Sequence, residues 1–125
     1  MEHVNKDKFK YYLTGLLEGD GSIIVPHQDR DSKERKIYPS IQIIFASKDF
    51  PLAMIIQKTL NFGSIHKKKG VNAYVLTINS LNNLYVMIEL LNGNMYTSKI
   101  YALHRLIDFV NNYYNKTYEK KQNRT

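Results

Sequence analysis

Residues 13–21 of the chain read Leu-Thr-Gly-Leu-Leu-Glu-Gly-Asp-Gly. Apolar residues recur at helical spacing through residues 9–17, so the stretch is predicted to be the second half of a helix. Two glycines among its last three residues end a helix well and lead into an extended segment. The chain is therefore expected to open with a helix that stops at residues 19–21.

The end of this helix combines a small-residue face with two acids. Gly15 and Gly19 are four residues apart, so they lie on one face and would let a second backbone approach closely. Glu18 and Asp20 follow at the C-terminal end, where the helix macrodipole disfavours negative charge. A divalent cation held by carboxylate and carbonyl oxygens would compensate for that charge. The alternative is a plain helix-to-strand turn with two exposed acids.

The rest of the chain alternates strand and helix signals. Residues 22–30 and 38–46 are predicted strands joined by a charged connection, and residues 64–68 and 73–78 form a predicted hairpin. Helices are predicted between the two strand pairs, after residue 80 and over residues 100–110. The predicted fold is an α+β domain of αββαββα order, with a four-stranded antiparallel sheet and its helices on one face. Residues 1–114 form this domain, and residues 115–125 are a polar tail that is expected to be flexible.

Composition limits the partners and the kinds of site. The chain has no cysteine, so a metal would be held by oxygen or imidazole, and oxygen ligands favour Mg²⁺, Ca²⁺ or Mn²⁺. The net charge is +7, and residues 63–125 carry 9 basic and 3 acidic residues, against 9 and 8 in residues 1–62. A basic domain attracts polyanions, most often nucleic acid, and the alternative is a solvated basic surface or an anionic membrane partner. No apolar run approaches the ~18 residues of a membrane span, so a membrane is not expected as a partner.

Residues 13–21 resemble the LAGLIDADG motif of homing endonucleases, in the form LTGLLEGDG. The predicted order of elements is similar to that family over roughly residues 8–112, which is more specific than the motif alone. Thr14 departs from the pattern because it replaces a small residue. The positions that fit closely are Leu13, Gly15, Leu16, Gly19, Asp20 and Gly21.

The resemblance implies that two such domains pack through their motif helices, and that each helix delivers its last acid, Asp20, to the interface. Asp20 and the Gly19 carbonyl would bind Mg²⁺, for which Mn²⁺ or Ca²⁺ could substitute in binding. The partner is a second copy of the chain, as a homodimer, or the other half of a two-motif protein. Glu18 is expected to make a structural contact instead, because residues two apart point in different directions on a helix. The implied interface residues are Leu13, Gly15, Leu16 and Gly19.

Two further residues are catalytic candidates through the same resemblance. Lys99 matches the basic residue before the last helix, and it would stabilise the charged transition state or position water. The alternative is a lysine near a helix start that binds phosphate or nothing. Ser47 stands where many relatives have Gln or Glu, and it is too short to reach as far. Lys48 beside it is expected to face a phosphate.

The family lays its sheet in the major groove of double-stranded DNA, so alternation along each strand selects the side chains that face bases. Gln28 and Gln42 suit adenine and Arg30 suits guanine by their bidentate geometry. The lysines of residues 67–69 are expected to contact phosphates. For each residue the alternative is an exposed position with no partner. The predicted DNA-binding residues are Ile24, Gln28, Arg30, Lys33, Arg35, Tyr38, Ser40, Gln42, Ile44, Lys48, Ser64, His66, Lys68, Val75 and Thr77.

The resemblance implies a site-specific double-strand DNA endonuclease that is active only as paired domains. One alternative is a non-cutting RNA maturase or DNA-binding domain that assists intron splicing. Another is a structural domain with an incidental basic face. The resemblance alone suggests an organelle, mitochondrial or chloroplast, as the location.

Overall fold

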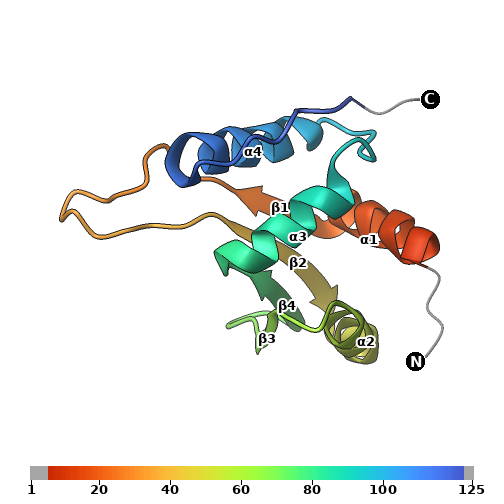
Figure 1. Cartoon of the computed structure of the whole chain (residues 1–125). Coiled ribbons are helices and arrows are strands. Elements are labelled where there is room, and N and C mark those ends of the chain that lie inside the picture. Colours follow the sequence, from red (N-terminus) through yellow and green to blue (C-terminus); the bar gives the residue numbers. More distant parts are fainter. Residues whose placement is uncertain (1–5, 123–125) are drawn as a thin grey trace.

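Helices and strands follow one another in the order that the sequence predicts (Figure 1). The computed structural model describes residues 6–122. Its elements are α1 (Lys6–Asp20), β1 (Gly21–Ile24), β2 (Ser40–Ala46), the 3-10 turn η1 (Ser47–Asp49), α2 (Phe50–Leu60), β3 (Ser64–Lys67), β4 (Ala73–Ile78), α3 (Leu81–Leu91) and α4 (Ile100–Tyr114). No helix within the described part of the chain is long and apolar enough to cross a membrane.

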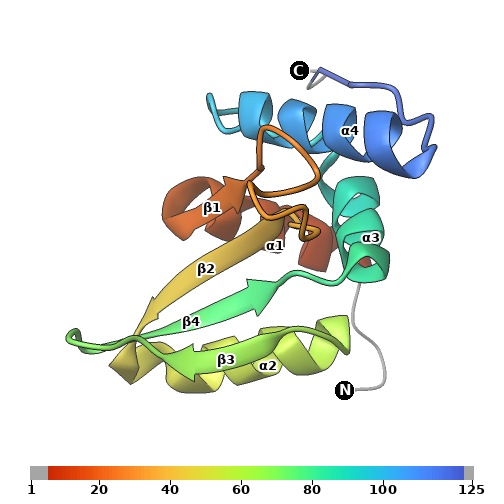
Figure 2. The same cartoon turned by 90° about the vertical axis from the view of Figure 1, so that its left-hand side faces the viewer.

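The four strands form one antiparallel sheet in the order β1-β2-β4-β3 (Figure 2). Strand β2 is central, because its Ile43 lies opposite both Gly21 of β1 and Leu76 of β4. The hairpin between β3 and β4 turns at Gly70, whose φ of 83° lies in the region that favours glycine. The predicted hairpin and the predicted α+β class are confirmed.

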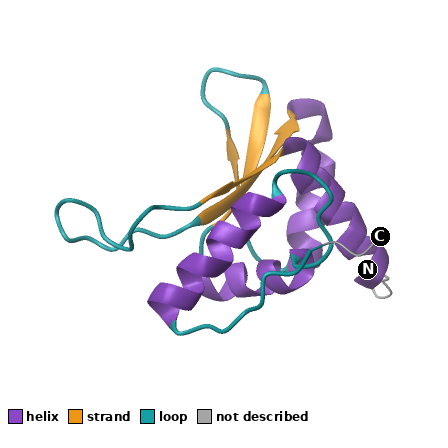
Figure 3. Cartoon of the chain, turned by 90° about the horizontal axis from the view of Figure 1, so that it is seen from above, coloured by secondary structure: helices purple, strands orange, loops and turns teal. Residues whose placement is uncertain are grey.

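The helices lie on one side of the sheet and leave the other side bare (Figure 3). Strand alternation decides which side chains are buried. In β2, Ile43 and Phe45 are at most 4% exposed, whereas Ile44 between them is 41% exposed. The largest fully buried side chains are Leu13, Leu17, Ile41, Ile43, Ile56, Leu76, Ile78, Leu84, Met87, Ile88, Leu91 and Met95. They come from the core face of the sheet, from α1, α2 and α3, and from the connection after α3.

The first predicted strand, over residues 22–30, extends too far. β1 ends at Ile24, and residues 25–39 leave the sheet as a long segment, called the β1–β2 loop below (Figure 1). Pro26 has no N–H to donate to a neighbouring strand, which disfavours a continuation of β1. Within this loop, Arg30 forms an isolated antiparallel bridge with Lys36. β2 likewise begins at Ser40 rather than at residue 38.

Residues 115–122 turn back along α4 and are called the C-terminal strap below (Figure 1). The Asn111 side chain holds Tyr118, donating to its carbonyl oxygen at 3.0 Å and accepting from its N–H at 3.1 Å. Asn92, just after α3, makes two more hydrogen bonds to the strap backbone, of 2.7 and 3.0 Å. The tail predicted to be flexible is therefore held in place over residues 115–122. Residues 1–5 of the predicted domain and residues 123–125 of the predicted tail lie outside the described residues.

Candidate active site and nucleic-acid interface

Asp20 is the last residue of α1, and the chain passes from it directly into β1. This tight passage requires Gly21, because a Cβ there would overlap with the Leu17 side chain and lie 2.8 Å from the Leu17 carbonyl oxygen. The Asp20 side chain is exposed, and within residues 6–122 it makes no hydrogen bond or ion pair. An unpartnered acid thus stands at the helix end where the dipole disfavours it.

Lys99 binds the backbone on both sides of Asp20. Its Nζ donates to the carbonyl oxygens of Leu17 at 3.1 Å and of Gly21 at 2.6 Å. The ammonium satisfies a carbonyl that the helix end leaves without an intrahelical partner, and it offsets the negative end of the dipole. The structure therefore brings two predicted site residues together, Lys99 and the turn that carries Asp20.

Glu18 holds the loop from which Lys99 projects. Its Oε1 accepts hydrogen bonds from the backbone N–H of Thr97 at 2.9 Å and from that of Tyr96. The hydroxyl of Thr97 in turn accepts from the N–H of Lys99 at 3.3 Å. Glu18 thus makes a structural contact, and its carboxylate is engaged by the loop rather than by a site shared with Asp20; that this contact lies near an interface stays a prediction.

The α1 face that bears the two glycines is open. Gly15 and Gly19 are exposed, and a Cβ added to either would meet no atom within 4 Å. Their small size therefore serves no contact within the described chain. Leu13 is expected on the same face, but it is 0% exposed and belongs to the core, and Leu16 is partly buried against that core. Of the four residues of the implied interface, Leu13 therefore has no exposed surface to offer a partner, whereas Gly15 and Gly19 do.

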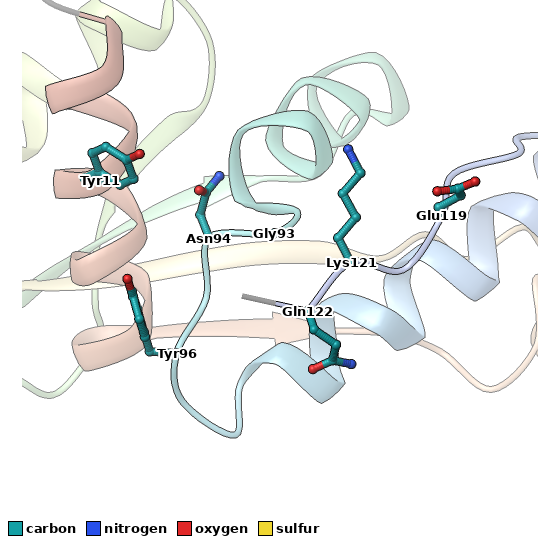
Figure 4. A pocket seen from close by; sticks show the side chains of 7 residues that line it. All are labelled: Tyr11, Gly93, Asn94, Tyr96, Glu119, Lys121 and Gln122. Carbon is teal, nitrogen blue, oxygen red and sulfur yellow. The ribbon is translucent and has the colours of Figure 1, made fainter. Parts of the chain in front are cut away.

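Two tyrosines extend this face toward the start of α1. Tyr11 is 60% exposed and Tyr12 is 48% exposed. Sequence reasoning did not single them out, because aromatic residues at helical spacing also suit a core. Figure 4 shows Tyr11 beside a groove whose other walls include Tyr96 and Lys121 of the strap. Exposed tyrosines next to bare glycines are typical of a surface that another protein covers.

The bare face of the sheet carries the strand residues that are predicted to contact DNA. The register aligns them in rows across the sheet, with Gln42 opposite Thr77 and Ile44 opposite Val75. Polar and apolar groups alternate on this face, as base edges and thymine methyls require. The residues on it are Ile24, Ser40, Gln42, Ile44, Ser64, His66, Val75 and Thr77.

The remaining predicted base contacts lie in the β1–β2 loop rather than on a strand, and Asp31 organises its tip. Asp31 Oδ1 accepts from the N–H groups of Lys33 at 2.8 Å and Arg35 at 3.0 Å, and its Oδ2 accepts from Arg35 Nε at 2.8 Å. The backbone N–H of Arg35 is the main reason that the pKa of the Asp31 carboxyl lies below its ordinary value. Arg30 donates through Nη1 to the carbonyl oxygen of Glu34 at 2.8 Å. The loop tip is therefore ordered by its own side chains.

The base of the same loop packs against the end of α4. The rings of Tyr38 and Tyr114 are stacked with centroids 6.4 Å apart, and Lys36 Nζ lies 5.2 Å from the Tyr114 ring centroid. The Tyr114 hydroxyl is buried with no hydrogen-bond partner in the described part of the chain, and burial raises the pKa of this phenol. Tyr38 therefore braces the loop as well as facing outward, while Gln28 is exposed without such a contact.

Ser47 begins η1, directly after β2. Its N–H donates to the Asn72 carbonyl oxygen at 3.1 Å, and its Oγ accepts from Lys67 Nζ at 3.4 Å. The sequence pattern groups Lys67 with Lys68 and Lys69 and does not distinguish it from them, whereas the structure gives it this specific contact. Lys48, which follows Ser47, and Lys68, which follows Lys67, are both exposed. Over residues 6–122, no three His, Asp or Glu side chains gather as a metal-binding group.

A family model described as LAGLIDADG endonuclease matches residues 13–110. The intron-encoded DNA endonuclease aI3 of Saccharomyces cerevisiae is 37% identical over 114 residues, which cover 91% of this chain and 27% of that protein. The probable intron-encoded endonuclease 4 of Neurospora crassa is 33% identical over 89 residues, which cover 70% of this chain and 15% of that protein. The chain thus spans at most about a quarter of the length of these two relatives.

Solved structures share the fold. The homing endonuclease I-CvuI, in complex with its target, has a TM-score of 0.68 at 17% identity, covering 86% of this chain and 71% of its own. The LAGLIDADG meganuclease I-CpaMI, bound to uncleaved DNA, has a TM-score of 0.67 at 26% identity, covering 88% of this chain and 39% of its own. At 17% identity, the similarity to I-CvuI shows only that the two chains share a fold.

Proposed function

This chain belongs to the LAGLIDADG endonuclease family, and on that premise we propose that it supplies half of a site-specific double-strand DNA endonuclease. The observation that carries the proposal is the end of α1, where the exposed Asp20 follows an open glycine face. One domain offers one such acid, so cutting both strands needs two domains. The second is another copy of this chain or a further domain of a longer protein.

Association through α1 is supported by the space around Gly15 and Gly19. Nothing in the described chain fills that space, and a second helix could approach to backbone contact there. A two-fold symmetric pairing uses the same patch on both copies, so features close to the symmetry axis face their own counterparts, and we propose that the end of α1 lies close to that axis. It would therefore set two Asp20 carboxylates side by side, each at the end of its helix.

The donor chemistry at this helix end fits a hard divalent cation. Asp20 offers carboxylate oxygens that no described residue engages, and Lys99 binds the carbonyls of Leu17 and Gly21 rather than that of Gly19. Two paired domains would offer two such sets of oxygens, which suit Mg²⁺, with Mn²⁺ or Ca²⁺ as substitutes in binding. When bound, such an ion polarises the phosphoryl oxygen and lowers the pKa of the attacking water. Lys99 keeps the Asp20 turn in position and offsets the negative charge that gathers there.

The bare sheet face is the surface proposed to bind DNA. It is uncovered by helices, and a strand pair fits the major groove, which is about 12 Å wide. Gln42 and Thr77 offer hydrogen bonds to base edges from adjacent strands. At the tip of the β1–β2 loop, Lys33 and Arg35 are exposed and suit backbone phosphates.

We assign DNA cleavage to an assembly larger than this chain, because the chain spans only part of the length of its relatives. The names of those relatives, intron-encoded endonucleases of fungi, support a gene within an intron. A mitochondrial or chloroplast location is part of the same proposal.

The test is cleavage of a plasmid library with randomised inserts, in Mg²⁺ and in EDTA. We expect the wild type to cut only in Mg²⁺, and Asp20→Asn to cut at least about 100-fold more slowly, because the amide lacks the charge that holds the cation. Symmetric cleaved sites would indicate a homodimer, and asymmetric ones two different domains. Equal cutting by Asp20→Asn would refute the site. A wild type that cuts no DNA but binds RNA tightly would favour the splicing alternative.

A further inference from the structure

One end of the sheet gathers residues beyond those already assigned to the Asp20 site. β2 ends there, β3 ends there at Lys67 and β4 begins there at Ala73, because these strands are antiparallel. β1 also starts toward this end, directly after Asp20, and its first residue, Gly21, lies opposite Ile43 of β2. Three more residues complete β2, so its end lies about 10 Å beyond Gly21, the residue after Asp20, along the strand direction. That distance corresponds to about three base-pair steps of DNA.

Three groups from separate segments hold the Lys67 ammonium at this end. Nζ lies 3.4 Å from Ser47 Oγ and 3.3 Å from Asn72 Oδ1, and 5.2 Å from the centroid of the Tyr74 ring. Lys67 is paired with Tyr74 in the β3–β4 register, and Phe50 packs on the same ring at 4.5 Å between centroids. The position of this lysine is therefore set by η1, β4, α2 and the hairpin together.

The charge of Lys67 is not neutralised by the groups that hold it. Both hydrogen-bond acceptors are neutral, and the ion pairs of residues 6–122 do not include Lys67. An ammonium has three N–H donors, and two point to Ser47 and Asn72, so one remains for an anion. The side chain is exposed, and both bonds are long enough to yield to a stronger acceptor.

We propose that Lys67 binds a backbone phosphate of the DNA close to the one cut at Asp20, and that Ser47 and Asn72 are positioning residues that act through it. This inference rests on the proposed function. A charge-assisted hydrogen bond to a phosphate, aimed by a fixed side chain, places the neighbouring scissile phosphate within reach of Asp20. Ser47 thereby gains a role that differs from direct contact with water or metal.

The test compares single-turnover cleavage and DNA affinity for four variants of the full chain, on a duplex recovered from the randomised library. Lys67→Met should cut at least about tenfold more slowly at saturating protein, because small misplacements at a reacting centre cost about 100-fold. For the same variant, the slope of log affinity against log salt concentration should become shallower by about one, as expected for the loss of one phosphate contact. Lys67→Arg should restore most of both values, and Ser47→Ala should show a smaller loss of the cleavage rate. Lys116→Met is the matched control, since Lys116 Nζ also lies over a tyrosine ring, at 4.2 Å from that of Tyr85, but in the C-terminal strap.

Several outcomes separate the two proposals. If Asp20→Asn loses cleavage while Lys67→Met resembles Lys116→Met in both readouts, the role of Lys67 is refuted and the proposed function stands. If the wild type cuts nothing in the library, the proposed function fails. The salt dependence, measured then on a random-sequence duplex in Ca²⁺, still decides whether Lys67 contacts a phosphate. Thermal unfolding of each variant separates loss of fold from loss of contact.

Discussion

Alanine at both Gly15 and Gly19 is expected to stabilise the folded chain while it prevents association. Neither glycine has a positive φ, and an added Cβ would meet no atom within 4 Å, so alanine fits both positions. A helical glycine costs about 0.5–1 kcal/mol relative to alanine. Gly19 lies one residue from the helix end and should contribute less than Gly15. The free energy of unfolding of the double alanine variant should therefore rise by roughly 1 kcal/mol, which raises Tm by about 4 °C for a chain of this size.

The same methyl groups oppose association. In a two-fold symmetric interface each substitution occurs twice, so four methyl groups enter the space where two helices would meet. Overpacking a close contact costs about 1–3 kcal/mol at each site. The low end of that range at four sites is roughly 4 kcal/mol, which weakens the dimer Kd by about 1000-fold.

Sedimentation equilibrium would measure the association, and thermal unfolding of dilute monomer would measure the stability. Gly21→Ala is the contrasting variant, because its Cβ would lie 2.8 Å from the Leu17 carbonyl oxygen, and it should lower stability by about 1–3 kcal/mol. A double variant that associates as tightly as wild type would refute the α1 interface. A double variant whose monomer melts at a lower temperature than wild type would mean that the glycines serve the fold of the chain itself.

Three further predictions concern single side chains. Glu18→Ala removes the acceptor for two loop N–H groups, so the free energy of unfolding in urea should fall by about 1 kcal/mol. Cleavage should also slow, because the loop that carries Lys99 loses its support. An unchanged cleavage rate would contradict this coupling. The folded-state pKa of Asp31 is lowered, so its contribution to loop order is complete above the unfolded value of about 3.9 and is lost as pH falls through the folded pKa. The NMR shift of the Arg35 N–H should therefore stay constant on acidification down to about pH 4, and a change above that pH would contradict the assignment. Tyr114→Phe removes a buried hydroxyl with no described partner, so the free energy of unfolding should be unchanged or rise by up to about 1 kcal/mol in thermal denaturation, and a clear loss would reveal a partner.

The sheet and its exposed face were predictable from the sequence because strand geometry has a period of two. Once Ile43 is assigned to the core, Gln42 and Ile44 must face the other way, and the structure confirms this. The length of β1 was not predictable in the same way. The β1–β2 loop has polar residues that suit either a solvated strand or a self-bonded loop, and contacts such as those of Asp31 decide between them.

The candidate site was predictable where it depends on neighbours in the chain and missed where it depends on distant ones. Helical spacing predicts that Gly15 and Gly19 share a face of α1 and that the helix ends near Asp20, but it does not say which face turns toward the core, so the burial of Leu13 was not predictable from it. The run of lysines at residues 67–69 is visible in the sequence, but the contacts that distinguish Lys67 are not. Its partners lie 20 and 5 residues away in the chain and meet it only in the folded sheet.

The C-terminal strap couples its own docking to whatever covers α1. Glu119, Lys121 and Gln122 of the strap line the same groove as Tyr11 (Figure 4). A partner domain that lies on the exposed face of α1 would therefore also meet the strap. By thermodynamic linkage, a strap held against α4 favours that partner, and the bound partner in turn favours the docked strap.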